Sequence, residues 1–471
     1  MKARSIIFSL LIFIAFFAYG QNGNPVSLIT EISDSANVVT KSIIKDYNGI
    51  PISYIEMGGR HYFTVATQRS SLNNIELKKA EISNDYSVND FAFHGEYLYC
   101  CGTYLKMYGF IGCVKISDFV ENNSFDFKGC HYFVNQNNMD NYVKDLFKLV
   151  VYQYSDLLYV VSIGETINEY KEERGCVMAI EIPNNGVNIA YKVGESSSAK
   201  EKFNDIEVTS NYVVTVGSES SSPDAAIRRF PKNSILILQP YSNDVYKYPT
   251  NEQEPSLHLA EDIIDFSITK VIGDTVAIAS YWYIPQSANL GTYLRGTLLR
   301  LYNLTTPLAP TMMTSISINQ NYYTGNWKLK ELQYNDILEM FIILQDAEVS
   351  QTSHQSMVTK IDFNPLSVQS EYFPNIELSS LANVNGSMYY LASGYGKPNA
   401  NKYFMVKNKL AIHNSNTICG TYYTENLSFK NIRTHKIDNI PLNTFGTNLD
   451  FIPIDYISIN IEVFNNSCVK Y

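Results

Sequence analysis

The sequence predicts an all-β fold, a β-propeller of about seven four-stranded antiparallel blades, with six or eight blades as the alternatives. Three observations support this. Apolar runs open on Asp90, Asp145, Asp205 and Asp265, which are separated by 55, 60 and 60 residues. Each of these runs is followed by others rich in β-branched and aromatic residues. The chain has 36 Tyr and 24 Phe but only 17% charged residues, a balance typical of half-buried strands.

The first twenty residues have the features of a cleaved secretory signal. A basic start precedes the apolar stretch Ile6–Phe17, which is short for a membrane span. Ala18 and Gly20 then supply small residues at the −3 and −1 positions before Gln21. We therefore expect cleavage after Gly20 and a secreted or periplasmic protein, with an uncleaved anchor as the alternative. No later segment is apolar enough to predict a membrane span.

The mature chain is expected to carry a propeller over residues 21–410 and a C-terminal segment, 411–471, that completes or caps it. Removing the two basic residues of the signal takes the formal net charge from −10 to −12. An acidic surface repels phosphate backbones, and no Lys/Arg cluster with interleaved aromatics appears, so nucleic-acid binding is not expected. We expect a monomer with a protein or glycan partner.

The second unit is the template of the repeat. Asp90 lies in the run Val88–Phe93, and the runs Tyr97–Cys101 and Gly109–Ile116 follow it. Short apolar runs separated by Gly-containing turns are typical of an antiparallel meander. The same order recurs at 143–147, 157–163 and 175–180; at 203–206, 212–216 and 234–238; at 264–266, 275–279 and 296–301; and at 331–332, 340–344 and 357–361. Weaker units are expected at 52–55, 62–66 and 75–82, and at 378–384, 388–391 and 403–406.

No helical period of useful length appears after the signal, and no alternation of strands with helices. Two β-sandwich domains are the competing interpretation, because sandwiches also use short strands with frequent turns. The recurrence of one strand order with the acid at one position favours the propeller.

Several of these segments also carry a resemblance. The matching segments are Val88–Phe91, Tyr97–Gly102, Gly109–Gly112, Asp46–Gly49 and Tyr62–Val65. In them the chain resembles a group of uncharacterised secreted β-propeller-like proteins of Bacteroidetes. The resemblance covers roughly the first quarter of the mature chain and rests on structural motifs. It implies export and a β architecture, and it assigns no catalytic residue.

The recurrent acids are the first candidate site. The first strand of each propeller blade lines the central channel, so acids at one position of that strand would form a partial ring near one mouth. The candidates are Asp90, Asp145, Asp205, Asp265 and Glu331. Their mutual repulsion would raise their pKa values, unless a cation such as calcium or a basic group relieves it. The structural alternative is a turn in which Asp accepts hydrogen bonds from backbone N–H groups two residues on.

Aromatic residues near loops are the second candidate site. Tyr281, Trp282, Tyr283 and Trp327 could stack on sugars or hold a protein partner if they are exposed. The alternative is that these rings pack inside the blades, because neighbouring residues of a strand point to opposite faces.

Seven cysteines in an exported chain predict some disulfides. Cys419 and Cys468 bracket the last fifty residues and are candidates for a bond that closes the tail. Cys100 and Cys113 lie in neighbouring runs and are candidates for a bond across a hairpin, while Cys130 is another partner for Cys113. No Cys-x-x-Cys spacing exists, which argues against a zinc site and a thioredoxin-like pair.

Neither Gly-x-Ser-x-Gly, His-Glu-x-x-His nor a P-loop occurs in the chain. The first functional hypothesis is therefore a non-enzymatic exported propeller that binds a protein or glycan through its inter-blade loops. The alternative is a hydrolase or lyase that acts on a polysaccharide or glycan with acids at the channel mouth. A third is a structural surface component. Acids that converge in a concave pocket would favour catalysis, and a flat rim with exposed tryptophans would favour binding.

Overall fold

The computed structural model describes most of the chain between residues 27 and 464. The described residues are 27–31, 39–68, 75–122, 125, 127–134, 142–167, 173–182, 189–193, 202–218, 225–235, 244–248, 262–272, 274–285, 293–304, 311–319, 326–337, 339–350, 353–363, 366–374, 376–385, 387–394, 403–409, 421–424, 427–429, 435–436, 442–446, 448–452 and 456–464. They form an all-β protein of small antiparallel sheets. In this part of the chain no helix is long and apolar enough to cross a membrane.

Consecutive strands pair as antiparallel meanders, as the alternation of short runs and turns predicts. The first three consist of β2 (Val39–Tyr47), β3 (Ile50–Met57), β4 (Arg60–Gln68) and β5 (Ile75–Ile82); β6 (Tyr86–His94), β7 (Tyr97–Tyr104), β8 (Tyr108–Lys115) and β9 (Phe127–Val134); and β10 (Tyr142–Tyr154), β11 (Leu157–Ile167), β12 (Glu173–Ile182) and β13 (Ile189–Val193). The second and third meet edge to edge at one register pair, Val134 with Tyr142. The short helix α2 (Ile116–Asn122) follows β8.

The later meanders have the same order. They consist of β14 (Lys202–Val208), β15 (Tyr212–Ser218), β16 (Ala225–Pro231) and β17 (Asp244–Tyr248); β18 (Asp262–Ile272), β19 (Thr275–Pro285), β20 (Tyr293–Asn303) and β21 (Thr311–Asn319); β22 (Asn326–Asn335), β23 (Met340–Ser350), β24 (Ser353–Phe363) and β25 (Leu366–Pro374); and β26 (Ile376–Val384), β27 (Ser387–Gly394) and β28 (Tyr403–Lys409). The last of them takes its fourth strand from the start of the chain, since β1 (Ser27–Glu31) pairs with β28.

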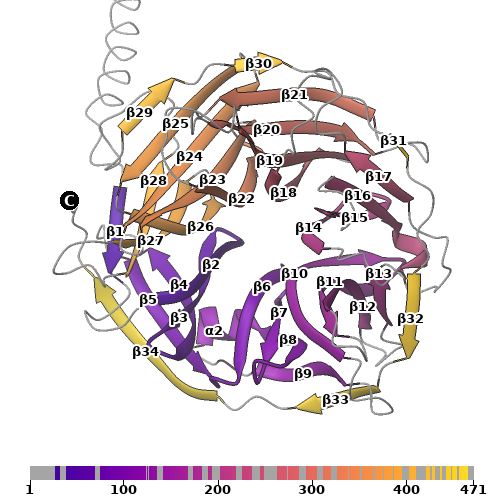
Figure 1. Ribbon diagram of the computed structural model, residues 1–471. Helices are drawn as coiled ribbons and strands as arrows, with labels where there is room; N and C mark the ends of the chain where they lie inside the picture. The colour runs from indigo at the N-terminus through magenta and orange to yellow at the C-terminus, as the bar shows by residue number, and fades with distance from the viewer. Residues whose placement is uncertain are drawn as a thin grey trace, which may run out of the picture.

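The meanders follow one another around a common centre, with the first strand of each on the inside (Figure 1). These inner strands are β2, β6, β10, β14, β18, β22 and β26. Each inner strand contacts that of the next meander, and β26 contacts β2. The first and the last meander are therefore neighbours in space.

Every inner strand carries a β-bulge near its start. The register shifts lie between residues 39 and 41, 88 and 90, 143 and 145, 203 and 205, 263 and 265, 329 and 331, and 378 and 380. The residue that follows the shift is Lys41, Asp90, Asp145, Asp205, Asp265, Glu331 or Ser380. A bulge re-aims the side chain beside it. The acid repeat of the sequence is thus a repeat of one backbone irregularity.

The hydrophobic cores lie between the faces of neighbouring meanders. Phe63 of β4 packs on Phe91 of β6, with ring centroids 5.8 Å apart, and both belong to the core between the first two meanders. Ile116 and Phe119 bring one face of α2 into the same core. On the other face of the second meander, Cys101 belongs to the core that it shares with the third. Because both faces of a meander are covered, its strands are apolar in continuous runs.

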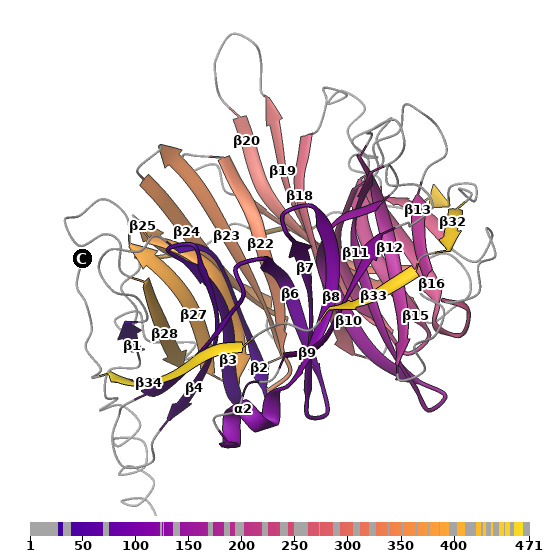
Figure 2. The same ribbon diagram turned by 90° about the horizontal axis from the view of Figure 1, so that it is seen from below.

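The C-terminal strap, residues 421–464, runs around the outside of the molecule (Figure 1). It contains β29 (Thr421–Thr424), β30 (Leu427–Phe429), β31 (His435–Lys436), β32 (Leu442–Gly446), β33 (Asn448–Ile452) and β34 (Tyr456–Phe464). These strands pair in turn with β25, β21, β17, β13, β9 and β5, all antiparallel. The strap therefore visits six meanders in the reverse of their order and covers the outer edge of each. Figure 2 shows β33 and β34 along the outside of the sheets.

Gly102 of β7 marks where the second strand of a meander passes the bulge. A Cβ at this position would lie 1.9 Å from the carbonyl oxygen of Ser87, and a Cβ at Gly164 would lie 2.0 Å from that of Asp145. These backbone atoms cannot move aside to relieve the clash as the end of a flexible side chain can. We expect Gly102→Ala to lower the free energy of unfolding by about 1–3 kcal/mol, as overpacking does, in chemical denaturation. Asn84→Ala, in an exposed turn, is the control and should leave it unchanged. Equal stability of the two variants would contradict the crowding argument.

Two expectations about strands are wrong. The third strand of the fourth meander is Ala225–Pro231 and not Ser234–Leu238, because Ser234 ends a short 3₁₀ helix. The charged residues of Ala225–Pro231 concealed the strand. Arg229 is nonetheless fully buried, with its guanidinium 4.7 Å from the ring centroid of Tyr212. The first meander also begins one strand earlier than expected, with β2.

The expected bond between Cys100 and Cys113 is also wrong. Cys100 lies opposite Gly112 and Cys113 lies opposite Tyr99, so the two side chains point to opposite faces of the sheet. Cys100 belongs to the core with the first meander, and Cys113 packs against the core with the third. The Cys130 side chain is outside the described part.

Cys419 and Cys468 lie outside the described residues, and a bond between them stays a prediction. They flank the strap, which begins at Thr421 and ends at Phe464. If the bond forms, non-reducing peptide mapping of the oxidised protein will recover one peptide pair that contains both cysteines. Recovery of each cysteine as a separate alkylated peptide would contradict it.

Candidate functional site

A cavity of ≈ 600 Å³ lies at the centre, between the inner strands. Its walls come from β2, β6, β10, β14, β22 and β26 together with Lys232. The carboxylates that line it are Asp46, Asp90, Asp205, Glu207 and Glu331, and the ammonium groups are Lys45, Lys148 and Lys232. The lining residues that the structure describes thus have a formal charge of −2. Three of the five acids predicted from the sequence, Asp90, Asp205 and Glu331, are among them.

Asp90 joins three meanders. One oxygen forms an ion pair with Lys45 of β2 at 2.6 Å, and the other accepts a hydrogen bond from the backbone N–H of Leu149 in β10 at 3.1 Å. The Asp90 residue is 2% exposed. A buried carboxylate is tolerated only when partners of this kind replace its water shell. Asp90 therefore fixes β6 against the inner strand on either side of it.

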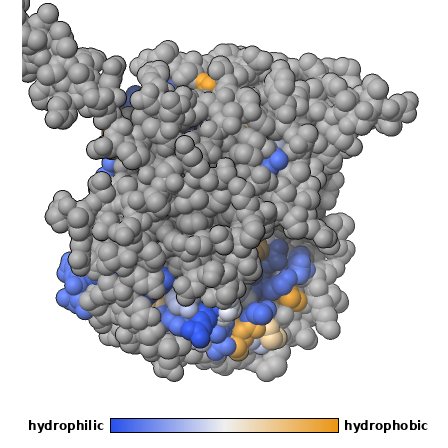
Figure 3. Space-filling model, turned by 90° about the vertical axis from the view of Figure 1, so that its left-hand side faces the viewer, coloured by the Kyte–Doolittle hydropathy of each residue, from blue (hydrophilic) through white to orange (hydrophobic). Residues whose placement is uncertain are grey.

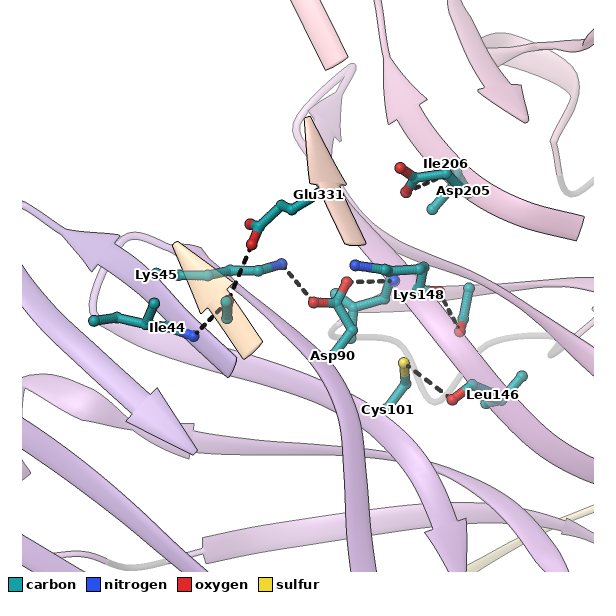
Figure 4. A network of polar contacts seen from close by, with 12 residues as sticks. Ile44, Lys45, Asp90, Cys101, Leu146, Lys148, Asp205, Ile206 and Glu331 are labelled. Carbon is teal, nitrogen blue, oxygen red and sulfur yellow. Dashed lines mark hydrogen bonds and ion pairs between the residues drawn. The ribbon is translucent and has the colours of Figure 1, made fainter. Parts of the chain in front are cut away.

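Glu331 plays a similar part in the sixth meander. The N–H of Leu381 and the hydroxyl of Ser380, both in β26, donate to one carboxylate oxygen at 2.9 and 3.0 Å. The amide of Gln333 donates to the other oxygen at 2.6 Å. Ser380 in turn accepts a hydrogen bond from the N–H of Ile44 in β2 at 3.2 Å. A chain of hydrogen bonds thus runs from the first meander through the last to the sixth (Figure 4).

Lys148 of β10 points into the cavity beside these acids. Lys45 and Lys148 approach Asp90 from opposite sides, with Asp205 and Glu331 nearby (Figure 4). Burial acts to lower the pKa of Lys148, but the surrounding carboxylates of Asp90, Asp205 and Glu331 outweigh it and raise the pKa above its usual range. Lys148 therefore stays an ammonium at neutral pH and is not a nucleophilic amine.

The remaining acids of the predicted ring have other surroundings. Asp145 accepts a hydrogen bond from the amide of Asn89 at 2.5 Å and another from the hydroxyl of Thr103, and burial raises its pKa. It therefore binds the second meander to the third without lining the cavity. Asp265 follows the bulge of β18, but its side chain is outside the described part.

Among the acids whose side chains the structure describes, the arrangement is neither a full ring around the cavity nor the expected turn, in which Asp accepts from an N–H group two residues on. Asp205 accepts from the N–H of Ile206, one residue on, at 3.0 Å. Asp90 and Glu331 instead accept N–H groups from the next meander. The sequence indicated that the acids repeat, but it could not indicate which backbone they reach, because that depends on how neighbouring meanders pack.

No family model and no curated protein matches the chain. The resemblance to secreted proteins of Bacteroidetes therefore stays a prediction. Among the described residues, no group of three or more His, Cys, Asp or Glu side chains has the arrangement of a metal site. Calcium binding by the recurrent acids likewise stays a prediction.

The aromatic candidates divide into two cases. Trp327 is fully buried in the core between the fifth and sixth meanders, so it is not a ligand-binding residue and the alternative of packing inside the blades holds for it. The large apolar surface of the indole ring makes its burial in this core more favourable than exposure at the rim. The side chains of Tyr281, Trp282 and Tyr283 lie outside the described part, so their role stays a prediction.

Three residues that matter for the site were missed in the sequence. Lys45 and Ser380 lie in strands that have no acid directly after the β-bulge, and Lys148 lies three residues after Asp145. One signal could have identified Lys148, because it is a single lysine within the otherwise apolar run Leu146–Val151. A lysine in a buried strand needs a charged environment, which the acids of neighbouring units supply.

The raised pKa of Glu331 has a consequence for stability. Burial disfavours the ionised carboxylate in the fold, whereas Lys148 and the N–H of Leu381 only partly offset this. Its contribution to stability is therefore greatest below the unfolded pKa, about 4.3, and is lost as the pH rises through the folded value. We expect Glu331→Gln to gain stability relative to the wild type between pH 4 and pH 7 in urea denaturation. A constant difference across this range would contradict the assignment.

Proposed function

We propose that the protein is an exported seven-bladed β-propeller that binds a glycan in its central cavity, without catalysing a reaction. The observation that carries the proposal is the cavity of ≈ 600 Å³ whose charged groups, apart from Lys232, come from the inner strands of several meanders. This volume lies in the range of small-molecule sites, about 300–1,000 Å³. It accommodates one or two sugar units at the end of a longer chain.

The propeller rests on the inner strands. Seven of them share a bulge near the start, each contacts the next, and β26 contacts β2. The N–H of Ile44 donates to Ser380 across this junction. Radial repetition of short meanders is the usual way in which propellers protect their edges. Export rests on the signal-like features of residues 1–20. Binding through the inter-blade loops stays a prediction, and the cavity is proposed beside it as the primary site.

Binding is favoured over hydrolysis because the acids already have structural partners. Both oxygens of Asp90 and both oxygens of Glu331 are held by groups of the chain itself. A nucleophile or general base must instead be directed at the substrate. One observation favours the hydrolase or lyase alternative: Glu331 combines a raised pKa with a place in a concave pocket, as general acids do.

The test is a glycan array with the mature chain, followed by calorimetric titration of the glycans that bind. Asn383 lines the cavity, and Asn383→Trp should fill it and weaken binding at least tenfold. Asn84→Trp introduces the same ring in an exposed turn and should bind as the wild type does. Failure of every glycan to bind, or equal binding by Asn383→Trp, would contradict the proposal. Release of new reducing ends from a bound glycan would establish the hydrolase alternative instead.

A further inference from the structure

Lys148 presents hydrogen-bond donors that no described residue of the chain accepts. Within the described part of the structure, the carboxylates around Lys148 act on it through space, and no side-chain or backbone acceptor binds its ammonium group directly. An ammonium has three N–H donors and no acceptor. A ligand in the cavity can therefore accept from it without displacing a protein contact.

Acceptors surround these donors. The carboxylates of Asp90, Asp205 and Glu331 line the same cavity, and a carboxylate has about four lone-pair sites. The three donors to Glu331 leave one of its about four sites for a ligand, whereas Asp90 is 2% exposed and holds Lys45 and Leu149. A hydroxyl group accepts and donates hydrogen bonds at once. Two neighbouring hydroxyls could each accept from Lys148 and donate to a different carboxylate.

Charge narrows the choice of ligand. The formal charge of −2 on the lining repels carboxylates, sulfates and phosphates. An ammonium group on the ligand would lie beside the ammonium of Lys148 and be repelled by it. An uncharged ligand is repelled neither by the acids nor by Lys148. Phe93 and Leu332, which also line the cavity, supply apolar surface for the C–H groups of a sugar ring.

We propose that Lys148, together with Asp205 and Glu331, recognises two adjacent hydroxyl groups of an uncharged sugar. This inference rests on the proposed function and specifies its ligand class. It assigns Lys148 as the residue that determines specificity, and it predicts that acidic sugars and amino sugars are rejected.

The experiment titrates the mature protein with a neutral glycan taken from the array, its deoxy derivatives and its uronic acid and amino-sugar counterparts. We expect the neutral glycan to bind, and loss of either adjacent hydroxyl to weaken binding about tenfold or more, as for hydrogen bonds to charged groups. Lys148→Met should weaken binding of the neutral glycan to a similar degree. Lys144→Met is the matched control, because Lys144 lies in the same strand with its side chain 36% exposed and paired with Glu173.

Asp205→Asn provides a second measurement that does not depend on removing Lys148. It keeps an acceptor and removes one negative charge, so the uronic acid should bind more tightly than it does to the wild type. If the charged glycans bind best, or if Lys148→Met binds the neutral glycan as the wild type does while Asn383→Trp does not, the ligand class is wrong and the cavity site stands. Absence of all glycan binding overturns both proposals.

Discussion

Deleting residues 411–471 is expected to leave a chain that aggregates instead of folding cooperatively. The deletion removes the C-terminal strap and uncovers the outer edges of β5, β9, β13, β17, β21 and β25. Unpaired sheet edges are templates for pairing with other chains. Size-exclusion chromatography and thermal unfolding of the truncated and intact mature chains measure the effect.

The control is a deletion of residues 465–471, which leaves every strand of the strap in place. It should elute and melt as the intact chain does. A chain ending at residue 410 that remained monomeric and kept the same melting temperature would show that the strap contributes nothing to the fold. On the flank in Figure 3 the described side chains are mostly hydrophilic, with small apolar patches.

Asp90→Ala is expected to be the most damaging single substitution at the cavity. It leaves the Lys45 ammonium and the N–H of Leu149 without their partner, and it removes one of the carboxylates that keep Lys148 charged. Removing one partner of a buried ion pair costs about 3–5 kcal/mol. The lower end of this range is expected here, because the Lys45 side chain is 27% exposed and water can partly replace its partner. Urea denaturation at pH 7 measures the loss.

Asp118→Ala is the matched control for this substitution. Asp118 pairs with Lys115 at 3.4 Å, but both side chains are 41% exposed, and exposed pairs contribute little. A loss of stability for Asp90→Ala no larger than that for Asp118→Ala would show that Asp90 does not hold the inner strands together. Asp90→Asn keeps the hydrogen-bond acceptor and should cost less than Asp90→Ala.

Much of the strand pattern could be predicted from the sequence because it depends on local order. The runs at Val88–Phe93, Tyr97–Cys101 and Gly109–Ile116 are the strands β6, β7 and β8 with small shifts at their ends. The glycine after the second run has a physical cause in the close approach of Gly102 to the bulge at Ser87. Local rules failed at Arg229, whose burial over Tyr212 depends on a neighbouring strand.

The partners in the site could not be predicted because they join residues far apart in the chain. The spacing of the acids indicated Asp90 and Glu331, but their contacts with Leu149 and Leu381 depend on the packing of one meander on the next. The junction of Ile44 with Ser380 spans almost the whole chain, and no sequence period refers to it. For the same reason, the residues next to Trp327 in the sequence do not show whether its side chain lies in a core or on the rim.

The reverse course of the strap affects how the protein can mature. The strand that seals the first meander, β34, is synthesised after all the meanders, so a chain that emerges from its amino end carries six incomplete units until its last strands arrive. Pairings between such distant segments form slowly, and the waiting chain is prone to associate with its neighbours. A chaperone that shields the uncovered outer strands would therefore have to act until the last strands of the chain are made.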